Sequence, residues 1–168
     1  MNGYLFDTCA ISSLLNTSHQ HHAAATAAVA ALDPNALQFV SIVTIGEMEF
    51  GLKMAEQANS AFLAQFRARI AVIKTYPILD LTKHTAAAYA ELKSLLAMTV
   101  QRKANSQKLS RWLEDWIDAN TGKQLQIDEN DLWVAAQAKE RDFTLVSGDD
   151  DMQRLSQIDP SLRLIFAR

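Results

Sequence analysis

The chain has 168 residues, a length typical of one domain, and 49% of them are apolar, which suffices for one hydrophobic core. No apolar run approaches the roughly 20 residues that a membrane span needs, and a single cysteine, Cys9, excludes an internal disulfide. With Asp7 inside the first apolar run a signal peptide is not expected, so we predict a cytoplasmic protein without membrane association. The net charge of −3 gives no general attraction for nucleic acid, although acidic residues gathered around bound cations would reverse the local sign.

Short apolar runs and longer periodic segments alternate along the first half of the chain. The runs predict strands at 3–7, 37–43 and 78–80. The periodic segments predict helices at 8–15, 19–32, 44–58 and 60–75, with turn residues between them.

The second half continues the alternation, with helices expected at 82–100, 105–120, 128–141 and 149–155 and strands at 143–147 and 162–166. Trp112 and Trp116, four residues apart, would share one face of the helix at 105–120 and pack in the core or at a dimer contact. Strands separated by helices favour an α/β fold, with a mostly parallel sheet flanked by helices, in a single domain covering 1–168.

Acidic residues stand where the predicted strands and helices meet. Asp7 ends the first strand, and Asp149 follows the strand at 143–147. Glu47 and Asp131 lie near the starts of two helices. Because the carboxyl ends of parallel strands lie on one edge of a sheet, we expect these side chains to approach one another.

Each acidic residue also has a purely structural explanation. Asp7 and Asp149 are suited to capping the helices that follow, and Asp131 falls in a first helical turn, where negative charge is favoured. Thr44 and Glu47 have the spacing of a capping box. Gathered together, however, these carboxylates would repel one another, and a divalent cation would relieve the repulsion. The pattern therefore favours an oxygen-lined site for a hard cation, open to a phosphate-bearing substrate.

Four segments carry a family resemblance: 4–12 (YLFDTCAIS), 41–51 (SIVTIGEMEFG), 129–136 (ENDLWVAA) and 145–152 (LVSGDDDM). They resemble, in order, the acidic motifs of PIN-domain nucleases, in particular VapC-type toxins of type II toxin–antitoxin systems. The resemblance implies a three-layer PIN-like fold, metal-dependent ribonuclease activity, a homodimer and inhibition by a cognate antitoxin protein. Gly148 and Met152 depart from the family pattern, which often has a basic or polar residue and a phenylalanine there. The segment 99–123 is longer than in compact members.

The resemblance also implies roles for particular residues. Asp7, Glu47, Asp131 and Asp149 would be the catalytic quartet that holds Mg²⁺ or Mn²⁺. Asp151 would be an auxiliary acid. Thr8 and Ser147 would be supporting hydroxyls.

The expected function is that of an endoribonuclease acting on structured RNA, such as tRNA or ribosomal RNA. Two alternatives stay open: a PIN-related DNA nuclease, and a degenerate PIN module that binds RNA or protein without catalysis. A haloacid-type phosphohydrolase would need a second acid two residues after Asp7, where Cys9 stands. A cysteine nucleophile at Cys9 would need a histidine to activate it, and none is placed to do so.

The segment before Trp112 holds the densest basic run of the chain: Arg102, Lys103, Lys108 and Arg111. These residues would either form a solvated helix face or provide a rim that contacts RNA phosphates beside the acidic site.

Overall fold

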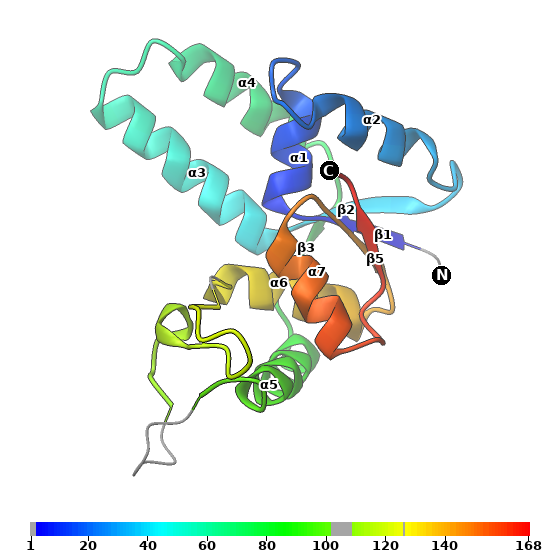
Figure 1. The fold of residues 1–168 in the computed structure, drawn as a ribbon. Helices are drawn as coiled ribbons and strands as arrows, with labels where there is room; N and C mark the ends of the chain where they lie inside the picture. The colour runs from blue at the N-terminus through cyan, green and yellow to red at the C-terminus, as the bar shows by residue number, and fades with distance from the viewer. Residues whose placement is uncertain (1–2, 102–108, 126) are drawn as a thin grey trace.

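In the part of the chain that the structure describes, the sheet has five strands, all parallel, in the order β3-β2-β1-β4-β5. The computed structural model describes residues 3–101, 109–125 and 127–168 (Figure 1). The strands are β1 (Gly3–Phe6), β2 (Leu37–Ser41), β3 (Ile78–Leu79), β4 (Thr144–Ser147) and β5 (Leu164–Phe166). This arrangement confirms the predicted α/β fold with a parallel central sheet.

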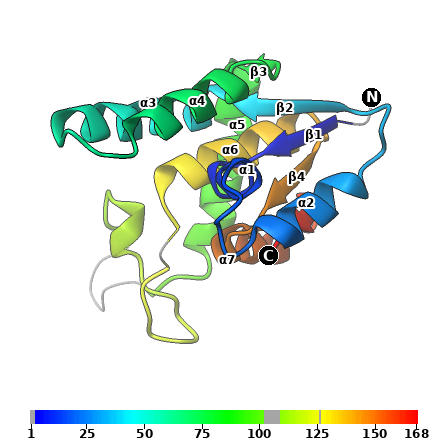
Figure 2. The ribbon, with the colours of Figure 1, turned by 90° about the horizontal axis from the view of Figure 1, so that it is seen from above.

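Two layers of helices cover the sheet (Figures 1 and 2). The helices are α1 (Thr8–Leu15), α2 (His22–Ala30), α3 (Ile42–Gln57), α4 (Leu63–Ile73), α5 (Lys83–Ala97), α6 (Glu129–Glu140) and α7 (Asp150–Ile158). In the part of the chain that the structure describes, none of them is long and apolar enough to cross a membrane.

Alternating side chains of the strands build two separate cores. On β1, Leu5 packs with residues of α5, α6 and α7, whereas Phe6 packs with residues of α1, α2, α3 and α4. Leu145 and Val146 of β4 divide in the same way. Because both faces of the central strands are buried, these strands are continuous apolar runs, as expected for a parallel sheet. Their carboxyl ends are thereby fixed side by side.

The start of α3 differs from the prediction. The helix begins at Ile42, and the Ser41 hydroxyl caps it by accepting a hydrogen bond from the Val43 amide at 2.9 Å. Thr44 lies buried inside the helix, so the predicted capping box of Thr44 and Glu47 is wrong. Since Glu47 is not needed as a cap, its carboxylate is available for contacts with other elements.

The helix predicted at 105–120 is also wrong in the part described. Residues from Leu113 to Asp115 form only a single 3₁₀ turn, and Trp112 is exposed while Trp116 is buried. Asp118 then accepts hydrogen bonds at 2.8 Å from the amides of Asn120 and Thr121, which closes a turn instead of extending a helix. Isolated bridges Val100↔Asp118 and Ile117↔Gln124 hold this segment in an extended, looped form.

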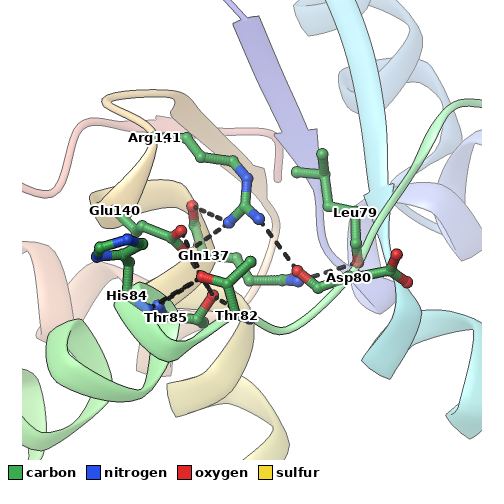
Figure 3. A network of polar contacts seen from close by, with 8 residues as sticks. All are labelled: Leu79, Asp80, Thr82, His84, Thr85, Gln137, Glu140 and Arg141. Carbon is green, nitrogen blue, oxygen red and sulfur yellow. Dashed lines mark hydrogen bonds and ion pairs between the residues drawn. The ribbon is translucent and has the colours of Figure 1, made fainter.

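A polar network ties the edge strand β3 and the start of α5 to the last turns of α6 (Figure 3). The Gln137 side-chain amide donates to the Leu79 carbonyl, and the Arg141 guanidinium donates to the Asp80 carbonyl, both at 3.0 Å. The Glu140 carboxylate accepts from the hydroxyls of Thr82 and Thr85, which also form the capping box of α5. The network fixes α6, whose opposite end carries Asp131, against the sheet.

We predict that Thr82→Ala lowers the free energy of unfolding by about 1–2 kcal/mol, because it removes a helix cap and a hydrogen bond to Glu140. Urea denaturation measures the change. Thr17→Ala, at an exposed turn, is the matched control and should stay within about 0.5 kcal/mol of wild type. Equal stabilities of the two variants would contradict the role of the network.

Candidate active site

A cavity of about 310 Å³ opens at the carboxyl edge of the sheet, where β1 and β4 end. All four acidic residues predicted from the sequence line it, although they come from four separate elements. Its lining is Asp7, Thr8, Cys9, Ser12, Glu47, Asp128, Asp131 and Asp149. We refer to it as the acidic cleft.

Asp7 lies at the base of the acidic cleft and is only 3% exposed. One carboxylate oxygen accepts a hydrogen bond from the Ala10 amide at 2.6 Å, which caps α1, and the other accepts from the Ser147 hydroxyl. Ser147 reaches Asp7 because Phe6 and Val146 are partners in the parallel register. The capping role expected from the sequence is therefore real, and it coexists with a position in the cleft.

Glu47 extends from α3 into the cleft and joins three elements. One carboxylate oxygen accepts from the Thr8 hydroxyl of α1, and the other accepts from the Asn130 side-chain amide of α6 at 2.9 Å. The position of Thr8 fits its predicted role as a supporting hydroxyl.

Asp131 and Asp128 form a reciprocal cap at the start of α6. The Asp128 carboxylate accepts from the Asp131 amide at 2.8 Å, and the Asp131 carboxylate accepts from the Asp128 amide at 3.3 Å. Asp149 caps α7 by accepting from the Asp151 amide at 2.9 Å, and its own amide donates to the Ser147 hydroxyl. Ser147 thus links the two acids that follow β1 and β4.

Two carboxylates of the cleft, Asp7 and Asp131, hold protons more tightly than a free aspartate does. Burial raises the pKa of Asp7 to about 7, against the hydrogen bonds from Ser147 and Ala10, and the charges of Asp149 and Glu47 add to the rise. Burial, followed by the charge of Asp128, raises the pKa of Asp131 to about 8. Without a cation nearby, the cleft therefore destabilises the ionised forms of Asp7 and Asp131.

Sequence reasoning missed Asp128 and Asn130. Asp128 stands three residues before Asp131, and an apolar run begins directly after Asp131 at Leu132. This is the spacing of a reciprocal cap and could have revealed Asp128. Asn130 has no such signature, because its significance comes from contact with Glu47, which is distant in sequence.

Other predicted site residues lie outside the lining of the cleft. Asp151, whose pKa is raised to about 6 mainly by burial and the charge of Asp149, lines a separate cavity with Arg154 and Lys123. Arg111 is exposed, with its guanidinium 5.2 Å from the ring centre of Trp112. The remaining members of the predicted basic rim fall outside the described residues: Arg102, Lys103 and Lys108.

Cys9 borders the cleft but is poorly suited to act as a nucleophile. Burial, together with the charges of Asp7 and Asp149, raises the pKa of its thiol to about 11. The thiol therefore stays protonated at neutral pH, which supports the reading of Cys9 as a small packing residue.

The two departures from the family pattern have local explanations. A side chain at Gly148 would bring its Cβ within 3.2 Å of the Ala167 carbonyl oxygen and 3.5 Å of the Cys9 sulfur, so this position has little room. Met152 is fully buried in the core beneath α7. The Asp149 loop is held by the hydrogen bond from the Asp149 amide to the Ser147 hydroxyl, whereas the ion pair of Arg168 with Asp150 is exposed to solvent and contributes little.

The donor set of the cleft fits a hard divalent cation, because every acidic ligand is a carboxylate oxygen. Within the described ranges, no three His, Cys, Asp or Glu side chains are already arranged to hold an ion. Their oxygens accept hydrogen bonds from Ser147, Thr8, Asn130 and the capping amides.

A comparison with protein families matches residues 4–158 to the family described as PIN domain. The chain belongs to the PIN domain family. The match runs from β1 to the end of α7 and includes all the acidic residues of the cleft. A comparison with curated protein sequences finds no match.

Solved structures share the PIN fold over the whole chain. A VapBC2 structure from Rickettsia felis has a TM-score of 0.65 at 19% identity and covers 100% of both chains. VapBC-5 from Mycobacterium tuberculosis, of the VapBC family of toxin–antitoxin systems, has a TM-score of 0.63 at 24% identity and covers 98% of each chain. VapC20 from the same organism, described as a sarcin–ricin loop cleaving toxin, has a TM-score of 0.54 at 14% identity, over 94% of this chain and 95% of that one.

The raised pKa values of Asp7 and Asp131 predict a pH-dependent stability of the metal-free protein. Both values lie above the ordinary value of 3.8, so the folded chain holds protons that the unfolded chain releases between about pH 4 and 8. The free energy of unfolding should therefore fall as pH rises through this range.

Urea denaturation in EDTA at both ends of the range tests this dependence. Near pH 8, the free energy of unfolding of Asp7→Asn should exceed that of wild type by at least about 1 kcal/mol, because the neutral amide avoids burying a charge. Asp150→Asn changes an exposed residue, so the pH dependence of its free energy of unfolding should match that of wild type. Parallel pH profiles for wild type and Asp7→Asn would show that burial does not perturb this carboxyl group.

Proposed function

We propose that this PIN domain protein is a metal-dependent endoribonuclease and the VapC-type toxin of a toxin–antitoxin system. The observation that carries the proposal is the convergence of Asp7, Glu47, Asp131 and Asp149 on one cavity from four separate elements. Family membership and the VapBC neighbours support the same conclusion. An intact acidic cleft favours a catalytic protein over a degenerate binding module.

Mg²⁺ or Mn²⁺ would be held by the four carboxylates, with Asp128 at the border of the same cavity. When bound, such an ion lowers the pKa of a coordinated water and offsets charge on the phosphodiester. The protein's own contribution is to position the ligands. Ser147 orients Asp7 and the Asp149 backbone, and Thr8 and Asn130 orient Glu47 from two sides.

The proposed partners are an RNA substrate, a cognate antitoxin protein and a second copy of the chain. The similarity to VapC20, whose described target is the sarcin–ricin loop, favours structured RNA such as ribosomal RNA, with tRNA as the other candidate. The exposed apolar side chain of Val72, on α4, suits a homodimer or an antitoxin contact. We also propose a cytoplasmic location, which is consistent with action on such RNA.

Purified protein should cleave structured RNA in the presence of Mg²⁺ or Mn²⁺ and not in EDTA. Asp7→Asn and Asp131→Asn should each lower the rate by more than about 100-fold, since even residues that only support metal ligands contribute about 10- to 100-fold. Asp150→Asn is the matched control, because Asp150 is exposed and paired with Arg168 outside the cleft. Sequencing of RNA ends measures the cleavage, and a single-stranded DNA substrate run in parallel tests the DNA-nuclease alternative. Full activity of Asp7→Asn would overturn the assignment.

Mn²⁺ should also stabilise the fold. At a concentration of about 100 times its dissociation constant, a ligand that binds only the folded state adds roughly 2.7 kcal/mol. The rise in melting temperature should be larger near pH 8 than near pH 5, because protons on Asp7 and Asp131 compete with the ion. Asp131→Asn should reduce the rise, and no rise in wild type at either pH would argue against a metal site in the cleft.

A further inference from the structure

A second, larger cavity of about 540 Å³ adjoins the acidic cleft, and Glu47 lines both. It lies between α3, the segment before α5 and the first turns of α6. Its lining is Ile42, Val43, Gly46, Glu47, Phe50, Leu81, Asn130 and Trp133. We call it the aromatic groove. Its size falls in the range of small-molecule sites, and its walls are mostly apolar with a few polar groups at one end.

Two aromatic side chains border the aromatic groove. Phe50 is 67% exposed, an unusual state for a phenylalanine on a helix. Trp133 stacks on Tyr89, with ring centres 4.0 Å apart and planes 12° from parallel. The Tyr89 hydroxyl in turn contacts Glu129 and accepts a hydrogen bond from Lys93 at 2.7 Å, which holds the stacked pair in place.

The polar end of the aromatic groove is the part shared with the acidic cleft. There the Asn130 side-chain amide donates to Glu47 at 2.9 Å, and the side chain is otherwise exposed. The side-chain oxygen of Asn130, Oδ1, accepts no hydrogen bond from the described residues. Such an oxygen can accept a hydrogen bond from an amino group on the edge of a base.

We propose that the aromatic groove binds one unpaired nucleobase of the RNA, from a nucleotide next to the phosphodiester in the acidic cleft. This inference rests on the proposed function and adds a specificity subsite to it. A base and its phosphate are both attached to the same ribose, so a site that holds the phosphate needs a place for the base close by. Specific recognition of single-stranded RNA commonly stacks a splayed base on aromatic side chains and reads its edge with a polar group. Phe50 and Trp133 provide the aromatic surfaces, and Asn130 provides the polar group.

Gly46 lines the aromatic groove, and its lack of a side chain leaves space there. A Cβ added at this position would have no heavy atom within 4 Å, and the backbone has an ordinary helical conformation. A large side chain there would occupy the groove without displacing its neighbours. Gly51, on the same helix but outside the groove lining, has the same free space and provides a matched control.

The test measures RNA binding separately from RNA cleavage. A short fluorescein-labelled single-stranded RNA of mixed sequence is bound to Asp7→Asn protein, and each nucleotide in turn is replaced by an abasic one. One abasic position should weaken binding by about 5- to 150-fold, the range for loss of one stacked base. In the double variant Asp7→Asn/Phe50→Ala, the same abasic change should leave the affinity for the RNA almost unchanged. Phe62 is a similarly exposed phenylalanine outside the groove. In the double variant Asp7→Asn/Phe62→Ala, the abasic change should therefore weaken RNA binding as much as it does in Asp7→Asn.

Filling the groove gives a second readout. Gly46→Leu should weaken binding of the unmodified RNA about as much as the abasic change does, whereas Gly51→Leu should leave it unchanged. Circular dichroism and melting temperature verify that both variants fold. If wild type cleaves no RNA but Asp7→Asn protein shows this pattern, the proposed function fails and the base site stands.

Two results would overturn the inference. One is an abasic penalty that Phe50→Ala leaves unchanged. The other is a loss of dimer mass in light scattering, or of antitoxin binding, in Phe50→Ala and Gly46→Leu with RNA affinity preserved. That second result would assign the aromatic groove to a protein contact.

Discussion

The burial of carboxylates, to which their mutual repulsion adds, is the constraint on which the site depends. Asp7 and Asp131 are held where solvent cannot stabilise their charge, and the pKa values of both rise accordingly. Two features of the fold maintain this arrangement. The parallel register places Asp7 beside Ser147, and helix amino-terminal ends attract the acids as caps. The capping hydrogen bonds that explain each acid singly are therefore also the means by which the acids are brought together.

The fold was largely predictable because its signals are local. Short and mainly apolar runs, such as residues 143–146, are typical of strands that are buried on both faces, and the acids that follow these strands mark the edge of the sheet. The prediction failed where local and tertiary signals disagree. Residues 109–120 carry helix-compatible tryptophans, but the Asp118 turn and the bridge from Val100 to Asp118 dominate.

The candidate site was predictable to a similar extent and for a similar reason. Asp7 and Asp149 follow strands in sequence, so topology alone brings them together. The sequence predicted the role of Glu47 less clearly, because the spacing of Thr44 and Glu47 also fits a capping box. The structure shows that Ser41 caps α3 instead. Asn130 could not be predicted, since only the packing of α6 against α3 brings it to Glu47.

The position of α6 connects the parts of the molecule. Its first two turns supply Asp131 to the acidic cleft and Trp133 to the aromatic groove, while its last turns are bound to β3 and to the segment before α5 through Gln137 and Arg141.

The most direct test of the central claim is the anomalous diffraction of crystals grown with Mn²⁺. The account predicts an ion in the acidic cleft about 2.1 Å from carboxylate oxygens that include those of Asp7. A cleft without an ion, with Asp7 still bonded only to Ser147 and Ala10 at saturating Mn²⁺, would contradict it.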